Sequence, residues 1–395
     1  MSDITGVPML DPRRANDLVQ EELHQAFDRC LGHGRFILGD EVTSFEEACA
    51  DYLGVKHAIG VSSGTDALIV SLMALDIGPG DEVICPTFTF FATAGSIWRV
   101  GAKPIFADSK PRCFNLDPSD VAAKITKRTK AVIPVHLFGQ CAEMESIGTI
   151  AASAGMPVIE DAAQAFGADT RGRKAGSLER LGCFSFFPAK NLGGFGDGGL
   201  VTTDDGALAD KVRALRAHGG QEMYDHPMVG GNFRLDALQA ALLNVKLAHV
   251  DAYAEGRHEN AATYTRLFVE AGVGAPGGGD ACSRECSKTD SADAPLILPT
   301  ACQGRHVYNQ YVLRAPGRRD ALQAHLKEKG VGCAVYYPRS MHLQGCFRDL
   351  GGKEGDFPVA EKLSSEVLAI PVFSELTEAE VQYVADTIIA FMKTN

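Results

Sequence analysis

Residues 183–194 read Cys-Phe-Ser-Phe-Phe-Pro-Ala-Lys-Asn-Leu-Gly-Gly, an apolar strand followed by a lysine and a glycine-rich turn. Four short apolar runs precede this stretch, and segments with helical patterns separate several of them. The apolar runs lie at 83–85, 104–106, 131–133 and 157–159, and the helical segments at 66–75, 118–125 and 144–154. Such alternation predicts an α/β domain built on a mostly parallel central sheet.

The chain outside this alternation divides into two further parts. An amphipathic helix is predicted near 19–30, and another long helix begins near Asp236. Residues 272–299 are rich in Gly, Ser, Asp and Pro, which predicts an exposed loop. We therefore predict a large domain over 1–250, with an N-terminal arm, and a smaller α+β domain over 251–395.

Composition excludes several classes of function. The 395 residues include 38 Lys and Arg against 50 Asp and Glu, a net charge of -12, which does not suit a nucleic-acid or anionic-membrane binder. No run approaches ~18 consecutive apolar residues, and the first five residues lack the order of a signal peptide. Eleven scattered cysteines without a C-x-x-C motif favour reduced thiols. We expect a cytoplasmic protein.

Lys190 is the first candidate for chemistry. Because it follows an apolar strand and precedes a run of glycines, its amine is expected to be desolvated, and a neutral amine can attack a carbonyl. The alternative is a lysine at a strand end that extends to water. The glycines also match the dinucleotide fingerprint G-x-G-x-x-G at 194–199, but residues 200–203 resemble a strand where that fingerprint requires a helix, so we discount it.

Asp161 is the second candidate, at the end of the apolar run in Pro-Val-Ile-Glu-Asp-Ala-Ala-Gln (157–164). Open α/β sheets place ligand groups at the carboxyl ends of their strands. A carboxylate there can pair with a protonated pyridine nitrogen and keep a cofactor ring electron-poor. A helix N-cap is the alternative role for this aspartate.

Two weaker signals precede these residues. Ser-Ser-Gly-Thr-Asp-Ala-Leu (62–68) leads into an apolar helix, whose free N–H groups and dipole would suit a phosphate, although a plain capped helix looks similar. Pro-Thr-Phe-Thr-Phe (86–90) places aromatic rings just after a strand, where one could stack on a flat cofactor or simply belong to the core.

Taken in order, these motifs resemble the DegT/DnrJ/EryC1/StrS family of sugar aminotransferases, which use pyridoxal 5′-phosphate (PLP) and have the fold of aspartate aminotransferase (fold type I). The likeness runs from Arg-Phe-Ile-Leu-Gly (35–39) to Tyr-Tyr-Pro (336–338) and Met-His-Leu-Gln (341–344), and includes Gly-Asn-Phe-Arg-Leu-Asp (231–236). It therefore covers most of the chain.

The resemblance implies roles for individual residues. Lys190 would form the Schiff base with PLP and move the proton, Asp161 would keep the pyridine nitrogen protonated, and Gln164 would lie beside the 3-hydroxyl of the ring. The other implied contacts are Gly64, Thr65 and Ser185 for the phosphate, Phe88 for ring stacking, Asn232 for the cofactor of a neighbouring subunit, and Arg234, Tyr308, Asn309, Tyr337 and His342 for the substrate. Asn232 thus predicts a homodimer with shared active sites.

The implied reaction is amino transfer from glutamate to a 3-keto or 4-keto nucleotide-linked deoxysugar. The sugar dehydrases of the same family replace the lysine with histidine, which argues against that alternative here. A non-catalytic regulatory protein with this fold is a second alternative, although every chemical position is filled. Neither the sugar nor its carrier, uridine or thymidine diphosphate, follows from the sequence.

One segment departs from the family pattern. Residues 274–294 look longer and more polar than the usual link, and they contain Cys282 and Cys286. These two cysteines with Cys302 could be read as zinc ligands, with His306 the sole nearby candidate for a fourth. Because that spacing is irregular, we favour a simple loop insertion and predict no metal site.

Overall fold

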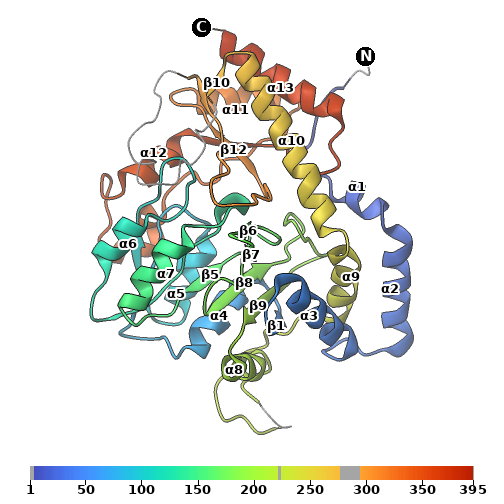
Figure 1. Ribbon diagram of the computed structural model, residues 1–395, viewed down its shortest axis with the longest axis vertical. Coiled ribbons are helices and arrows are strands. Elements are labelled where there is room, and N and C mark those ends of the chain that lie inside the picture. The colour runs from blue at the N-terminus through green and yellow to red at the C-terminus, as the bar shows by residue number, and fades with distance from the viewer. Residues whose placement is uncertain (1–3, 221–223, 276–293, 395) are drawn as a thin grey trace.

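A central sheet fills the lower lobe of the computed structural model, which describes residues 4–220, 224–275 and 294–394 (Figure 1). Two hydrogen-bonded groups of strands form this sheet, in the orders β1-β9-β8-β5 and β3-β2-β4. Parallel bridges from Val132 to Val158 and from Val135 to Asp161 join the groups. The strands are β1 (His57–Val61), β2 (Glu82–Pro86), β3 (Lys103–Ala107), β4 (Thr129–Val132), β5 (Ile159–Asp161), β8 (Leu181–Ser185) and β9 (Gly199–Thr203).

The pairings within this sheet are parallel except at β9, which runs antiparallel to both β1 and β8. Every residue of β2 and β9 is buried, as expected for strands covered on both faces. A mostly parallel sheet is therefore confirmed. Because residues 190–198 are irregular and β9 starts at Gly199, the glycine pattern there opens no helix, and the strand expected over 200–203 is confirmed.

Helices cover both faces of the sheet. Helix α4 contacts β8, β9, α5 and α8, and this burial explains why its sequence is apolar on nearly all sides. The helices of this lobe are α1 (Pro12–Asp17), α2 (Gln20–His33), α3 (Asp40–Leu53), α4 (Gly64–Ala74), α5 (Phe91–Arg99), α6 (Pro118–Lys124), α7 (Met144–Ser153), α8 (Gly206–Arg216) and α9 (Ala237–Leu247), with the short hairpin β6 (Asp169–Thr170) and β7 (Arg173–Lys174).

A smaller second sheet forms the upper lobe, in the order β10-β11-β12-β13. The long helix α10 leads into it, and α10, α11 and α13 pack around its apolar cluster. The elements are α10 (Val250–Glu270), β10 (Gly274–Ala275), β11 (Leu296–Ile297), β12 (Tyr311–Arg314), α11 (Arg319–Glu328), α12 (Pro358–Glu366), β13 (Val367–Ile370) and α13 (Glu378–Lys393).

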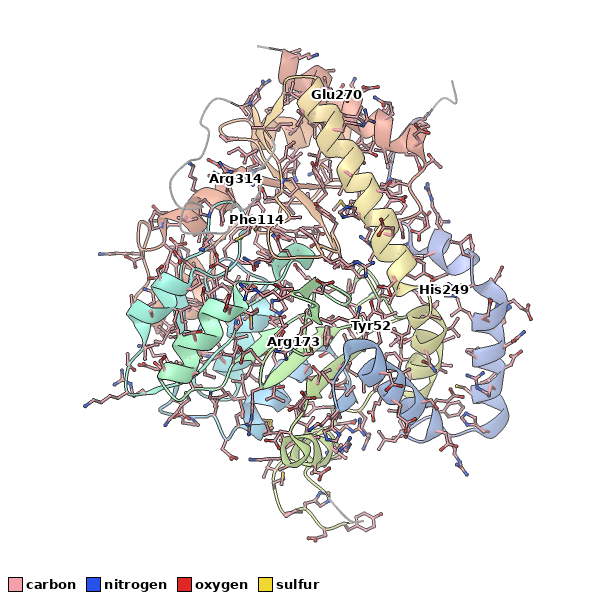
Figure 2. The ribbon with its side chains drawn as sticks, in the orientation of Figure 1. Tyr52, Phe114, Arg173, His249, Glu270 and Arg314 are labelled. Carbon is pink, nitrogen blue, oxygen red and sulfur yellow. The ribbon has the colours of Figure 1, made fainter. Side chains whose placement is uncertain are left out.

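Arg314 ties the two lobes together. Its buried guanidinium bonds Glu366 at 2.6 and 2.8 Å and donates to the carbonyl of Pro111 at 2.9 Å, close to Phe114 of the lower lobe (Figure 2). Part of the C-terminal region, including Phe347 and Ala360, also packs on the cluster of the central sheet. The domain boundary after residue 250 therefore stays a prediction.

Cysteine chemistry follows the expectation with one exception. Eight cysteines among the described residues carry free thiols. Cys302 is disulfide-bonded, which corrects the expectation of reduced thiols at that position. Cys282 and Cys286 lie outside the described residues, so the loop and zinc readings of that segment stay untested. Within the described ranges, no helix is both long and apolar enough to cross a membrane.

Candidate active site

Lys190 lies in the turn after β8, where its backbone N–H bonds the carbonyl of Phe187 at 2.8 Å. Burial lowers the pKa of its amine to about 8, while the nearby Asp161 carboxylate acts in the opposite direction. An amine with this pKa is partly neutral near pH 7, unlike an ordinary surface lysine. Desolvation therefore gives Lys190 the nucleophilic form that attack on a carbonyl requires.

Asp161 closes the carboxyl end of β5 and is buried. Thr93 of α5 donates its hydroxyl to Oδ2 at 2.8 Å, and the Ala163 N–H reaches Oδ1 at 3.3 Å. Burial raises the pKa of this carboxyl and the Thr93 hydrogen bond lowers it. Residues 162–168 form turns, so the helix N-cap interpretation is wrong.

Gln164 connects Asp161's loop to the predicted substrate residues. Its Oε1 accepts from the N–H of Phe138 at 2.7 Å, and its Nε2 donates to the hydroxyl of Tyr337 at 3.0 Å. The structure thus brings Gln164 and Tyr337 together, although they lie far apart in the sequence. The Tyr337 hydroxyl keeps its own proton available as a donor.

The start of α4 forms a compact cradle against the end of β8. A Cβ on Gly64 would lie 2.7 Å from the Cβ of Ser185, so only glycine permits this approach. Ser63 caps the helix by accepting from the Asp66 N–H at 3.0 Å. Among the described residues, the N–H groups of Gly64 and Thr65 have no acceptor, which suits a phosphate.

Two aromatic rings near the site differ in exposure. Phe88 is 1% exposed and packs between Phe114 and Tyr337, with ring centroids 6.4 and 6.1 Å away. Phe90 is 56% exposed and lies 6.2 Å from the ring of Tyr337. The predicted stacking role of Phe88 is untested, but its burial fits the core reading and leaves Phe90 as the ring with a free face.

The predicted substrate residues differ in whether their polar atoms are free to bind a ligand. Both amide atoms of the buried Asn309 have no partner in the described part of the chain, which suits a ligand contact. Tyr308 is buried against His306, with ring centroids 3.9 Å apart. His342 uses both ring nitrogens internally, bonding Thr87 at 2.8 Å and Glu361 at 3.1 Å. This geometry does not support the predicted substrate contact of His342.

The loop with Asn232 and Arg234 lies beside the phosphate cradle of the same chain. The carbonyl of Phe233 accepts from the Ser62 N–H at 2.8 Å, while the side chain of Asn232 is exposed. The buried Nε of Arg234 has no partner among the described residues. The predicted reach of Asn232 into a neighbouring subunit is untested.

Comparison with known proteins identifies the family. The model of the DegT/DnrJ/EryC1/StrS aminotransferase family matches residues 17–389. The chain belongs to this family. It is 48% identical over 389 residues to a pleiotropic regulatory protein of Geobacillus stearothermophilus, covering 98% of this chain and 99% of the relative. It is also 41% identical over 389 residues to UDP-N-acetyl-3-dehydro-alpha-D-glucosamine 3-aminotransferase of Acidithiobacillus ferrooxidans, covering 98% of each.

A solved structure gives the same result for the fold. DesV of S. venezuelae, determined in complex with a ketimine intermediate, superposes with a TM-score of 0.91 at 37% identity and covers 99% of both chains. The predicted fold type I is confirmed. PLP is the cofactor of the DegT/DnrJ/EryC1/StrS family, which confirms that prediction.

The described residues fit PLP. Lys190 offers a desolvated amine, Asp161 a buried carboxylate without a cationic hydrogen-bond partner, and the start of α4 a set of free N–H groups beside Ser185. Sequence reasoning missed Thr93, the donor to Asp161, and it assigned the ring-stacking role to Phe88 rather than to the exposed Phe90. Thr93 carried no signal, because it lies 68 residues before Asp161 and only the packed fold brings the two side chains into contact.

Proposed function

We propose that this chain transfers an amino group from L-glutamate to the 3-keto group of a nucleotide-linked sugar, with PLP as cofactor. The observation that carries the proposal is the desolvated amine of Lys190 beside the buried carboxylate of Asp161. The Acidithiobacillus relative, a 3-aminotransferase, supports position 3 over position 4.

When bound, PLP supplies a carbonyl for amines and a ring that accepts electrons. Lys190 would hold the cofactor and, once its amine is released, move a proton to and from the substrate carbon that bears the amino group. Asp161 would keep the ring nitrogen protonated, since a buried anion favours a cation at contact distance. Gly64, Thr65 and Ser185 would bind the phosphate, and the exposed Phe90 would contact the ring face in place of Phe88.

A regulatory role is the second candidate, because the Geobacillus relative is named a regulatory protein. The two functions differ in a simple spectrum. A transaminase converts its near-ultraviolet or visible cofactor band when glutamate is added, whereas a sensor that binds PLP without turnover keeps the band. The dehydrase alternative would require histidine at position 190, and this chain has lysine there.

We also propose that the chain forms a homodimer and works in the cytoplasm. The apolar side chains of Phe187, Phe195 and Val229 are exposed and flank the Lys190 turn and the 230–234 loop. Exposed apolar groups around a site are typical of a surface that another chain covers. The free thiols of eight described cysteines, six of them buried, support a reducing compartment.

The test is amination of a panel of keto sugars on uridine and thymidine diphosphate. Purified enzyme with PLP and [15N]glutamate should place 15N on a 3-keto substrate, detected by mass spectrometry. Transfer to 4-keto substrates alone would overturn the proposed position. Cofactor binding without transfer from glutamate to any keto sugar would favour the regulatory function.

A further inference from the structure

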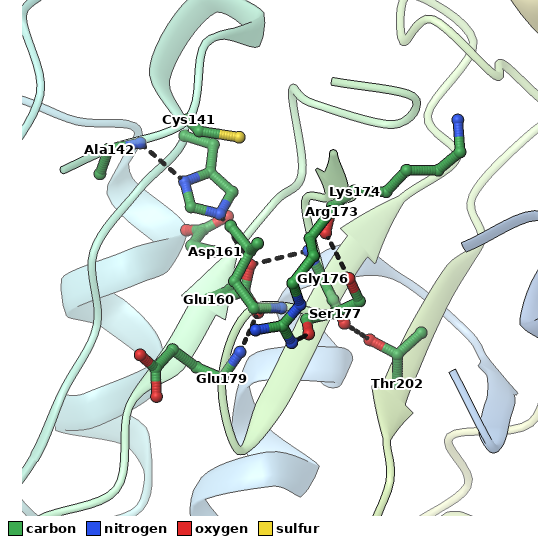
Figure 3. A network of polar contacts seen from close by, with 12 residues as sticks. Cys141, Ala142, Glu160, Asp161, Arg173, Lys174, Gly176, Ser177, Glu179 and Thr202 are labelled. Atoms are coloured by element: carbon green, nitrogen blue, oxygen red, sulfur yellow. Dashed lines mark hydrogen bonds and ion pairs between the residues drawn. The ribbon is translucent and has the colours of Figure 1, made fainter. Parts of the chain in front are cut away.

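A fully buried pair, His136 and Glu160, lies directly behind the candidate site and has no role so far. Neither side chain is exposed to solvent, and His136 Nε2 lies 2.9 Å from Glu160 Oε2. Glu160 is the neighbour of Asp161 in β5, and successive strand residues point to opposite faces. The pair therefore sits across the strand from the side chain of Asp161 (Figure 3).

Hydrogen bonds hold both side chains of this pair in place. The Ala142 N–H donates to His136 Nδ1 at 3.1 Å, so the imidazole proton resides on Nε2 and points at Glu160. The carboxylate also accepts the N–H groups of Gly176, Leu178 and Glu179 at 2.7–2.8 Å. Four donors thus surround the Glu160 carboxylate, and both ring nitrogens of His136 are used in hydrogen bonds.

Segment 136–138, which begins at His136, hydrogen-bonds both predicted ring-binding residues, Asp161 and Gln164. The N–H of His136 donates to the carbonyl of Asp161 at 2.9 Å, and the N–H of Asp161 donates to the carbonyl of Pro134 at 2.9 Å. Two residues later, the Phe138 N–H donates to Gln164 Oε1 at 2.7 Å. Residues 136–138 thus fix the backbone of Asp161 and the side chain of Gln164.

We propose that His136 and Glu160 are positioning residues, which lock segment 136–138 so that Asp161 and Gln164 meet the cofactor ring. The half-reaction readout rests on the proposed function, whereas the PLP Kd tests the positioning role independently of it. A ring of contacts runs from Glu160 through the imidazole and the His136 N–H to Asp161 and back along β5. Buried groups bonded on every side have little freedom to shift.

The test compares three variants. His136→Phe keeps the ring volume and removes both imidazole hydrogen bonds, whereas His136→Gln retains a donor and an acceptor. Thr202→Val is the matched control, because Thr202 bonds the Gly176 carbonyl at 2.6 Å and so anchors the same loop without contacting segment 136–138. Each apoenzyme is titrated with PLP by fluorescence, and the glutamate half-reaction is followed by absorbance.

We expect His136→Phe to raise the PLP Kd and to slow the half-reaction by on the order of 10- to 100-fold, the range seen when partners of site ligands are removed. His136→Gln should recover most of the loss, and Thr202→Val should lower only the melting temperature. In an Asp161→Asn background, the effect of His136→Phe on both readouts should shrink to less than about twofold, because the two residues act through one another.

Equal losses in both backgrounds would overturn the proposal, as would an unchanged Kd and half-reaction in folded His136→Phe. If His136→Phe does not fold, Glu160→Gln goes through the same cycle and is judged by the same criteria. A wild-type enzyme that binds PLP but does not react with glutamate would contradict the proposed function, while the Kd series would still decide the positioning role.

Discussion

The hydroxyl of Thr93 lies 2.8 Å from Oδ2 of Asp161 and donates to it, which joins α5 to the end of β5 inside the site. This bond favours the ionised carboxylate, whereas burial favours the protonated one. Thr93 therefore helps to keep Asp161 charged for its proposed contact with the cofactor nitrogen.

Thr93→Val should reduce turnover by about 10- to 100-fold, the equivalent of one hydrogen bond to a charged group. Without the donor the pKa of Asp161 rises further, so the carboxylate becomes protonated at a higher pH as the solution is acidified. The acidic limb of the kcat profile should move to higher pH. Thr89→Val is the control, because Thr89 contacts Thr93 at 3.1 Å but leaves the bond to Asp161 in place. An unmoved limb in Thr93→Val would contradict this account.

The pKa of Lys190 gives a second prediction. Since the neutral amine attacks, the rate of PLP attachment to the apoenzyme should rise with pH and level off above about 8. In Asp161→Asn the midpoint should fall, because the carboxylate's charge raises the lysine pKa in the native site. Stopped-flow absorbance measures both midpoints. A wild-type midpoint near that of an ordinary lysine would show that the amine is not desolvated.

Gly64→Ala tests the phosphate cradle. The new Cβ would press on Ser185, so we expect the PLP Kd to rise by on the order of tenfold through the displaced helix start. Gly206→Ala is the matched control, since Gly206 also opens a helix, α8, and its nearest neighbour would be 3.6 Å away. Equal Kd values for the two variants would exclude a role for the Gly64–Ser185 contact.

Subunit complementation tests the shared site. Lys190→Ala chains mixed with Asn232→Ala/Arg234→Ala chains, under conditions that exchange subunits, should regain a fraction of wild-type activity. A two-fold dimer in which Asn232 serves the opposite site restores one intact site per heterodimer. No recovery after exchange has been demonstrated would mean that each chain builds its site alone.

Local sequence was enough to place Lys190 and Asp161 near strand ends, because Asp161 closes β5 and Lys190 lies in the turn after β8, and such ends converge at one edge of the sheet. The sequence could not show which of Phe88 and Phe90 is buried and which is exposed, since residues just past a strand end follow no fixed alternation. The same holds for His342, whose partners Thr87 and Glu361 come from distant segments.

Hydrogen-bond partners that come from separate helices and strands could not be predicted from local sequence. The bonds from Thr93 to Asp161 and from His136 to Glu160 join residues 68 and 24 positions apart, and only the packed sheet brings them into contact. A lone threonine in a helix or histidine after a strand has no pattern that distinguishes it from an ordinary core residue.

Borohydride reduction before and after glutamate, followed by peptide mapping, tests the central claim most directly. Lys246 is an internal control, because burial lowers its pKa to about 8 as well, yet its amine donates to the Gly193 carbonyl at 2.6 Å. Reduction of the resting enzyme should fix the cofactor on Lys190 alone, and prior incubation with glutamate should abolish the label as the amino group moves onto the cofactor. A label on Lys246, or a Lys190 label unaffected by glutamate, would contradict the assignment of Lys190 as the amine that holds the cofactor for amino transfer.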